Sequence, residues 1–152
     1  MPSPDPADFV LSFVKTFKAL QDTLTRTLAA YGVHPGQNMM LSALADRDGR
    51  TPGELSEQLG ITGPTVVKAA QRMEAAGLVA RRRDDKDGRL VRIYLTPRGR
   101  SVVRPIEDDI RAIGERATAS LTPQQRCTLL AALDTVFRTL QAEPHGDPEP
   151  DG

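Results

Sequence analysis

The sequence of 152 residues contains no tryptophan, one cysteine and two histidines, and only 4% of its residues are aromatic. A single cysteine excludes an internal disulfide framework, and the scarcity of aromatic residues predicts a core of aliphatic side chains. No run of about 18 apolar residues is present, so we expect no membrane span. The first residues lack the basic and then apolar pattern of a signal peptide. These features together fit a cytoplasmic protein.

The sequence also lacks the groupings of residues on which enzymes depend. It has no Ser-His-Asp set, no glycine-rich phosphate loop and no paired His or Cys cluster. His34 has no second His or Cys at ligand spacing, and the other histidine, His145, lies in the tail. We therefore predict a protein that is not an enzyme, with no metal and no cofactor.

Charge is unevenly distributed along the chain, although the formal net charge is zero. Residues 60–100 carry ten Lys or Arg and four Asp or Glu, a net charge of +6, and the rest of the chain carries the opposing −6. Positive charge gathered on one segment is the electrostatic footprint of a module that binds nucleic acid.

Two short helices are predicted between residues 51 and 76. Thr51 can cap a helix, and Glu54, three residues later, completes a capping-box pattern. Gly60 suits the left-handed residue that ends this first helix. The second helix is expected over about residues 63–76. Two helices joined by a short turn that contains glycine bind DNA only in a suitable structural context.

The second predicted helix has two faces of different chemistry. One face is apolar at helical spacing and comprises Val66, Ala69, Ala70 and Met73. The other comprises Pro64, Thr65, Lys68, Gln71 and Arg72. A polar face with no carboxylate before Glu74 suits a DNA groove, although an ordinary solvated helix has the same pattern. The helix alone leaves both interpretations open.

A two-stranded ribbon is predicted from the β-type runs at residues 78–80 and 90–95. Val91, Ile93 and Leu95 alternate with polar residues, as in a strand with one buried face. The tip between the runs, residues 81–89, holds an Asp-Gly turn signal and five basic groups. Such tips are usually solvated loops, but cations at a ribbon tip can also enter a minor groove or bind phosphates.

At this point the sequence resembles the MarR family of bacterial transcription regulators. The resemblance rests on helix, turn, helix and then AAGLVARRRDDKDGRLVRIYLTPRG, and it covers about residues 8–142. Its most specific part is the pattern D-x-x-D-x-R from Asp84 to Arg89. Gly88 departs from the family, since many relatives carry a further arginine there. The fold implied is mostly α with a small β-ribbon, in which a winged helix-turn-helix is flanked by long dimerisation helices.

Long amphipathic helices are predicted on both sides of this module. Their apolar stripes need a partner, so we expect a homodimer with a two-fold axis. Its two recognition helices would lie about 34 Å apart over a palindromic operator. The expected segments are a flexible lead (1–6), a helical dimerisation region (7–48 and 97–142), the winged helix-turn-helix (49–96) and a disordered acidic tail (143–152).

The resemblance assigns the contacts with DNA to eight residues. Residues at the start of the second helix would contact base edges, and Arg72 and Arg82 would bind phosphates. Arg89 would enter a minor groove, oriented by a hydrogen bond to Asp87. The alternatives are a local salt bridge between Asp87 and Arg89, and plain solvation of Lys68 and Arg72. The full set is Thr62, Pro64, Thr65, Lys68, Arg72, Arg82, Asp87 and Arg89.

The resemblance also implies a repressor that is released or modulated by a small aromatic or phenolic effector. Its site would include Tyr31, His34, Met39, Met40 and Arg47, with core filling as the preferred interpretation of the methionines. For Cys127 we expect a half-buried structural thiol rather than a redox sensor. The rival to a DNA-binding regulator is a winged-helix module that binds protein.

Overall fold

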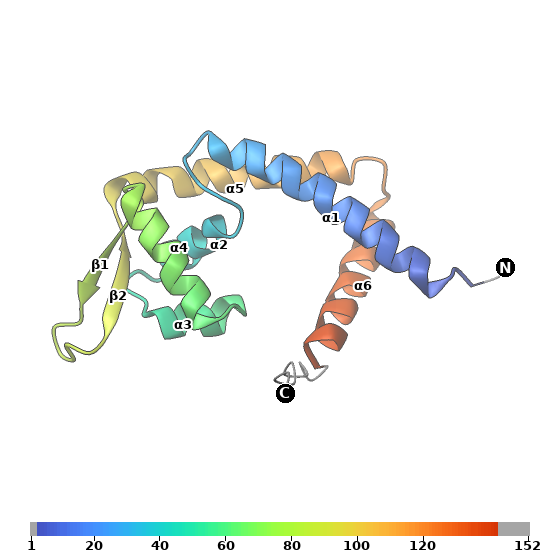
Figure 1. The fold of residues 1–152 in the computed structure, drawn as a ribbon. Helices are drawn as coiled ribbons and strands as arrows, with labels where there is room; N and C mark the ends of the chain where they lie inside the picture. Colours follow the sequence, from blue (N-terminus) through green and yellow to red (C-terminus); the bar gives the residue numbers. More distant parts are fainter. Residues whose placement is uncertain (1–2, 143–152) are drawn as a thin grey trace, which may run out of the picture. The chain divides into compact units, whose positions relative to one another are not determined.

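The computed structural model describes residues 3–142, which form six helices and one two-stranded sheet (Figure 1). The chain divides within its fifth helix into two compact units, residues up to 111 and residues from 112 onward. The predicted disordered tail, 143–152, lies outside the described residues, and the predicted lead is described only from residue 3. In chain order the elements are α1 (Pro6–Ala29), α2 (Gln37–Asp46), α3 (Pro52–Leu59), α4 (Gly63–Ala75), β1 (Val79–Arg83), β2 (Val91–Leu95), α5 (Pro97–Ala117) and α6 (Pro123–Ala142).

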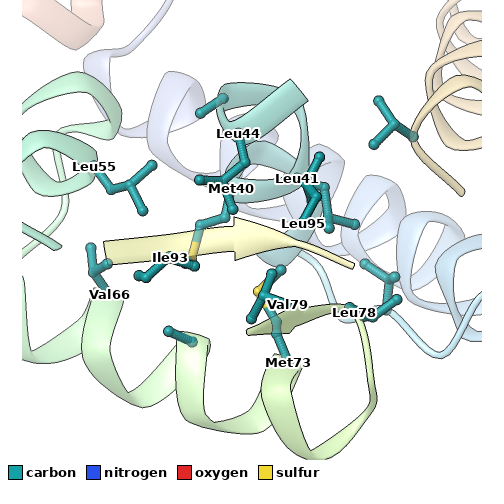
Figure 2. Packing of buried hydrophobic residues seen from close by; sticks show 14 of the residues in the cluster. Met40, Leu41, Leu44, Leu55, Val66, Met73, Leu78, Val79, Ile93 and Leu95 are labelled. Carbon is teal, nitrogen blue, oxygen red and sulfur yellow. The ribbon is translucent and has the colours of Figure 1, made fainter. Parts of the chain in front are cut away.

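One core fills the first unit, where helices α2, α3 and α4 pack around the base of the β1–β2 ribbon (Figure 2). The end of α1 reaches this core through Leu28, and α5 adds Val103 and Ile106. As the scarcity of aromatic residues predicts, the largest fully buried side chains are aliphatic or methionine. They are Leu28, Met40, Leu41, Leu44, Leu55, Met73, Leu78, Ile93, Ile106, Val33, Val66 and Val79. None of the described helices is long and apolar enough to cross a membrane.

The local signals that predicted α3 and α4 are confirmed. The Thr51 hydroxyl accepts the Glu54 N–H at 3.2 Å, and the Glu54 carboxylate accepts the Thr51 N–H at 2.8 Å, which completes the capping box. Gly60 ends α3 with φ 66°, in the left-handed region that glycine adopts without strain. Thr62 precedes α4, and its hydroxyl bonds the Thr65 hydroxyl at 2.8 Å rather than a backbone N–H.

The ribbon differs from the sequence prediction in two respects. Arg81 to Arg83, which we placed in the tip, belong to β1, so the tip is the shorter segment 84–90, here called the wing loop. Val91, predicted on the buried face, is 37% exposed, whereas Ile93 and Leu95 are buried. Val91 pairs with Arg83 at the far end of the ladder, where the core no longer reaches.

The terminal helices carry apolar surface that a single chain leaves open. On α1, Phe9, Phe13 and Phe17 are each close to half exposed, and consecutive rings lie 5.9 and 6.5 Å apart. In the second unit, α6 has no buried residue, and its exposed apolar side chains include Leu130 and Phe137. Burying such a stripe of large side chains is favourable, so each of these faces is suited to contact with another surface.

Candidate nucleic-acid interface

The predicted polar face of α4 is open to solvent. The buried side of the helix consists of Val66, Ala70 and Met73, which anchor it in the core, and Ala69 is half-buried. All side chains of the predicted face are exposed, namely Pro64, Thr65, Lys68, Gln71 and Arg72, and the apolar Val67 and Ala75 are exposed as well. This surface offers hydroxyl, amide and cationic groups, which are the groups that bind base edges and phosphates.

One edge of this face is joined to the ribbon through Glu74. Its carboxylate accepts the Arg81 backbone N–H at 3.0 Å and the Arg81 side-chain nitrogens Nε and Nη2 at 3.2 and 2.9 Å. These hydrogen bonds from Arg81 lower the pKa of Glu74. Arg81, predicted among the basic groups of the tip, instead forms a clamp that joins β1 to α4.

The other edge of the α4 face borders a pocket of about 290 Å³. Its walls come from the connection between α1 and α2, the start of α2, the α3–α4 turn and α4, with Met40, Ile61 and Ala69 as apolar members. The polar and cationic members include His34, Gln37, Thr65, Lys68 and Arg72. Three residues of the predicted DNA set therefore also line the pocket.

The wing loop is closed by hydrogen bonds from its own carboxylates. Asp84 Oδ2 accepts the Asp87 N–H at 3.1 Å, and Asp87 Oδ1 accepts the Arg89 N–H at 3.0 Å. The Asp84 N–H donates to the Leu90 carbonyl at 2.9 Å. Asp87 thus orients Arg89 through the backbone, and no ion pair joins these two side chains within residues 3–142.

Two arginines on the ribbon have roles that the sequence did not indicate. Arg82, predicted to bind phosphate, has its guanidinium 5.6 Å from the centre of the Tyr94 ring, within cation–π range. Arg92, absent from the predicted site, donates to Asp84 from Nε at 2.8 Å and to the Gly49 carbonyl from Nη1 at 2.8 Å. These contacts depend on the register of the ribbon, which no local pattern in the sequence indicates.

The residues of the predicted effector site are not brought together as one group. His34 and Met40 line the pocket beside α4, and Met40 is also buried in the core. Met39 is 52% exposed on α2. Tyr31 donates a hydrogen bond to Asp109, which raises the Tyr31 pKa. Arg47, beyond the other end of α2, pairs with Glu54 at 3.1 Å.

Cys127 differs from the predicted half-buried thiol. It lies on the exposed surface of α6, with no disulfide partner in the described part of the chain. The prediction was wrong because α6 buries none of its residues against this chain.

Comparison with known proteins places these features in one family. A model described as MarR family matches residues 31–90. An HTH-type transcriptional repressor of Mycobacterium tuberculosis is 31% identical over 108 residues, which are 70% of this chain and 78% of that protein. The HTH-type transcriptional repressor MdtR of Bacillus subtilis is 26% identical over 119 residues, 78% of this chain and 77% of that protein.

Solved structures agree with this assignment. A MarR transcriptional regulator from Methanosarcina mazei Go1 is 27% identical, with a TM-score of 0.72 over 87% of this chain and 96% of that one. The S. aureus MepR–DNA complex shares the fold, with a TM-score of 0.78 at 20% identity over 90% of this chain and 99% of that one. The winged helix-turn-helix expected from the sequence is confirmed. The chain belongs to the MarR family of DNA-binding transcription regulators and is not an enzyme.

Proposed function

We propose that this protein represses transcription in the cytoplasm by binding a palindromic operator as a homodimer. The observation that carries the proposal is the clamp between Glu74 and Arg81, which holds the ribbon against the edge of the exposed α4 face. In this proposal, Lys68 and Arg72 on α4 and Arg89 on the wing loop form one cationic surface. A helix in the major groove and a wing in the adjacent minor groove would use this surface.

A second copy supplies the two-fold symmetry that a palindrome requires. The stripe of Phe9, Phe13 and Phe17 on α1 is the apolar surface that we assign to this contact, together with the exposed face of α6. Recognition helices one turn of B-DNA apart, about 34 Å, correspond to an operator of about 16 to 20 base pairs. Gel filtration at micromolar concentration tests this step, and a monomer there would contradict it.

DNA binding is tested by fluorescence anisotropy with a labelled duplex of arbitrary sequence. We expect binding at about 50 mM salt and its loss at several hundred millimolar, because phosphate contacts release counterions. A winged helix that binds only protein would give no salt-sensitive signal. Selection from a pool of random duplexes then supplies the operator for measurements on variants.

On the selected operator, Lys68→Ala and Arg89→Ala should each cost about 1–3 kcal/mol of binding free energy. The matched control is Arg104→Ala, since this arginine of α5 has an 81% exposed side chain and pairs with Asp108 within its own helix. Operator affinity equal to that of the control would remove either residue from the interface.

We further propose that the effector is a small aromatic anion bound in the pocket beside α4. Met40, Ile61 and Ala69 would contact the ring, and Lys68 and Arg72 would pair with the negative charge. Because these two cations also belong to the proposed DNA surface, ligand and DNA would compete for them. Effector binding would in this way release the operator.

A hydroxybenzoate added to the anisotropy assay tests this competition. It should raise the apparent Kd for DNA in the wild type and much less in His34→Ala, which alters a pocket wall. Arg47→Ala is the control, because Arg47 belongs to the predicted effector set but lies at Glu54 and not in the pocket. An equal response of the His34 variant and the wild type would place the effector elsewhere.

A further inference from the structure

We propose that Arg92 is a positioning residue that fixes the wing loop, and with it Arg89, relative to helices α3 and α4. The proposal rests on the proposed DNA binding, since the wing loop matters only if Arg89 meets DNA. It assigns to Arg92 no contact with DNA of its own.

The Arg92 guanidinium joins three separate parts of the first unit. Nε donates to Asp84 Oδ1 in the wing loop at 2.8 Å, and Nη1 donates to the carbonyl of Gly49 in the α2–α3 turn at 2.8 Å. The Glu54 carboxylate, at the start of α3, lies 3.9 Å from Nη1. One side chain therefore connects the wing loop to the segment that begins the helix-turn-helix.

The side-chain contacts of Arg92 lie next to a backbone contact between β2 and the α2–α3 turn, on the side toward the wing loop. Ile93, next to Arg92, forms a β-bridge with Arg50, with the Ile93 N–H donating to the Arg50 carbonyl at 2.9 Å. This bridge holds β2 to the α2–α3 turn at Ile93. On the tip side of Ile93, no backbone hydrogen bond within residues 3–142 joins the ribbon to that turn. The Arg92 side chain provides the next contact outward, at the point where the ribbon leaves the core.

Asp84 links Arg92 to the part of the wing loop that carries Arg89, the residue proposed to enter the minor groove. It accepts Arg92 Nε with one carboxylate oxygen and the Asp87 N–H with the other. Asp87 in turn accepts the Arg89 N–H at 3.0 Å. The Asp84 side chain is only 17% exposed, against 30% for Arg92. An unbroken series of charge-assisted hydrogen bonds thus runs from the α2–α3 turn to the backbone of Arg89.

The acceptor at Gly49 is itself held in place. Gly49 has φ 71°, and a Cβ there would lie 2.7 Å from Cε1 of the Tyr94 ring. The Tyr94 ring, on the same face of β2 as Arg92, packs against the backbone of this turn. Both partners of Arg92, the Asp84 carboxylate and the Gly49 carbonyl, are therefore held in place, as expected for a positioning residue.

The test compares two pairs of substitutions on the selected operator. Arg92→Gln should lower affinity about tenfold, and in that background Arg89→Ala should cost much less than in the wild type, because the two act on one contact. Arg83→Gln is the matched control: it removes an exposed cation of the same ribbon that forms no ion pair within residues 3–142. Its effect should add to that of Arg89→Ala. Additive effects for Arg92→Gln would overturn the proposal.

Hydrogen exchange supplies a readout that needs no DNA. In Arg92→Gln and Asp84→Asn, the amides of Asp87 and Arg89 should exchange faster, while those of α4 keep their wild-type rates. Arg83→Gln should leave the wing amides unchanged, and unchanged wing amides in Arg92→Gln and Asp84→Asn would reject the proposal. If the wild type bound no duplex at all, the proposed function would fail, while the exchange rates would still decide whether Arg92 orders the loop.

Discussion

Replacing Gly99 with alanine tests how closely α5 approaches the exit of the recognition helix α4. A Cβ at Gly99 would lie 1.9 Å from the carbonyl oxygen of Leu78 and 2.9 Å from its carbonyl carbon. Both are backbone atoms, so no side-chain rotation can relieve the overlap and the first turn of α5 must move. The Leu78 carbonyl also accepts the Thr96 N–H at 3.1 Å, and this bond would lengthen or break.

The magnitude follows from three contributions. Forcing an extra methyl group into a closely packed site costs about 1–3 kcal/mol, and the lost backbone hydrogen bond costs about 1 kcal/mol. Alanine returns up to about 1 kcal/mol relative to glycine inside a helix. The net loss of unfolding free energy is about 2 kcal/mol, which for a chain of this size lowers Tm by about 4–8 °C.

Thermal unfolding followed by circular dichroism measures this loss, at one protein concentration because the Tm of a dimer depends on concentration. Gly114→Ala is the control within the same helix. Gly114 is exposed and its Cβ would meet nothing within 4 Å, so its Tm should equal or exceed that of the wild type. If the Gly99→Ala and Gly114→Ala proteins had the same Tm, the close approach of Gly99 to the Leu78 carbonyl would be refuted.

Three further predictions concern pH, assembly and salt. The hydrogen bond from Arg92 lowers the pKa of Asp84. The contribution of Asp84 to the free energy of unfolding is therefore present above the ordinary aspartate pKa of about 3.9 and is lost as pH falls below that value. Urea unfolding should show a stability difference between wild type and Asp84→Asn that is present at pH 7 and shrinks in acid, and a constant difference would contradict this. Phe13→Lys should shift the dimer to monomer in gel filtration whereas Phe13→Leu should not, because burial of a large apolar side chain contributes about 1.5–3 kcal/mol; a dimeric Phe13→Lys protein would remove α1 from the contact. Arg89→Ala should reduce the slope of log K against log salt by about one per half-site, and an unchanged slope would show that Arg89 meets no phosphate.

The helices were predictable because their signals are local. Thr51 with Glu54 at the start of α3, and Thr122 with Gln125 at the start of α6, each form reciprocal hydrogen bonds over three residues. Glycine at position 60 marks the end of α3 by its backbone freedom alone. Each of these features depends on a few neighbouring residues, so their pattern in the sequence suffices.

The contacts of the ribbon were not predictable, because they depend on its register. Arg92 meets Asp84 only once Arg83 is known to lie opposite Val91, and Arg81 meets Glu74 only once β1 turns back along α4. The same pairing brings Arg82 to the Tyr94 ring. Arginines 81, 82, 83 and 92 therefore have different environments, which the local sequence around each of them does not indicate.

The predicted effector set separated for a related reason. The family resemblance suggested one site in this region, but α2 is a helix whose successive residues point in different directions. Met40 faces the core and Met39 faces solvent. Arg47 follows the other end of α2, one helix length from His34. A set drawn from residues 31–47 can therefore share one pocket only in part.

The +6 charge of residues 60–100 overstates what this segment offers to DNA. Arg81 and Arg92 are paired with Glu74 and Asp84, and Arg100 with Asp48. Arg98 donates at 2.8 Å to the Ala76 carbonyl, where a cation is favourable beside the C-terminus of α4. Within residues 3–142, the cations of this segment whose side chains form neither an ion pair nor a hydrogen bond are Lys68, Arg72, Arg82, Arg83, Lys86 and Arg89.

These six lie on the exposed face of α4 and on the outer part of the ribbon, while two of the paired arginines, Arg81 and Arg92, hold the ribbon to α4 and to the α2–α3 turn. Charge in this segment thus has two uses. Partly exposed pairs fix the geometry of the wing, and the remaining cations give this surface its positive charge. Removing one of the first kind should change where the second kind points without changing how many phosphates they can neutralise.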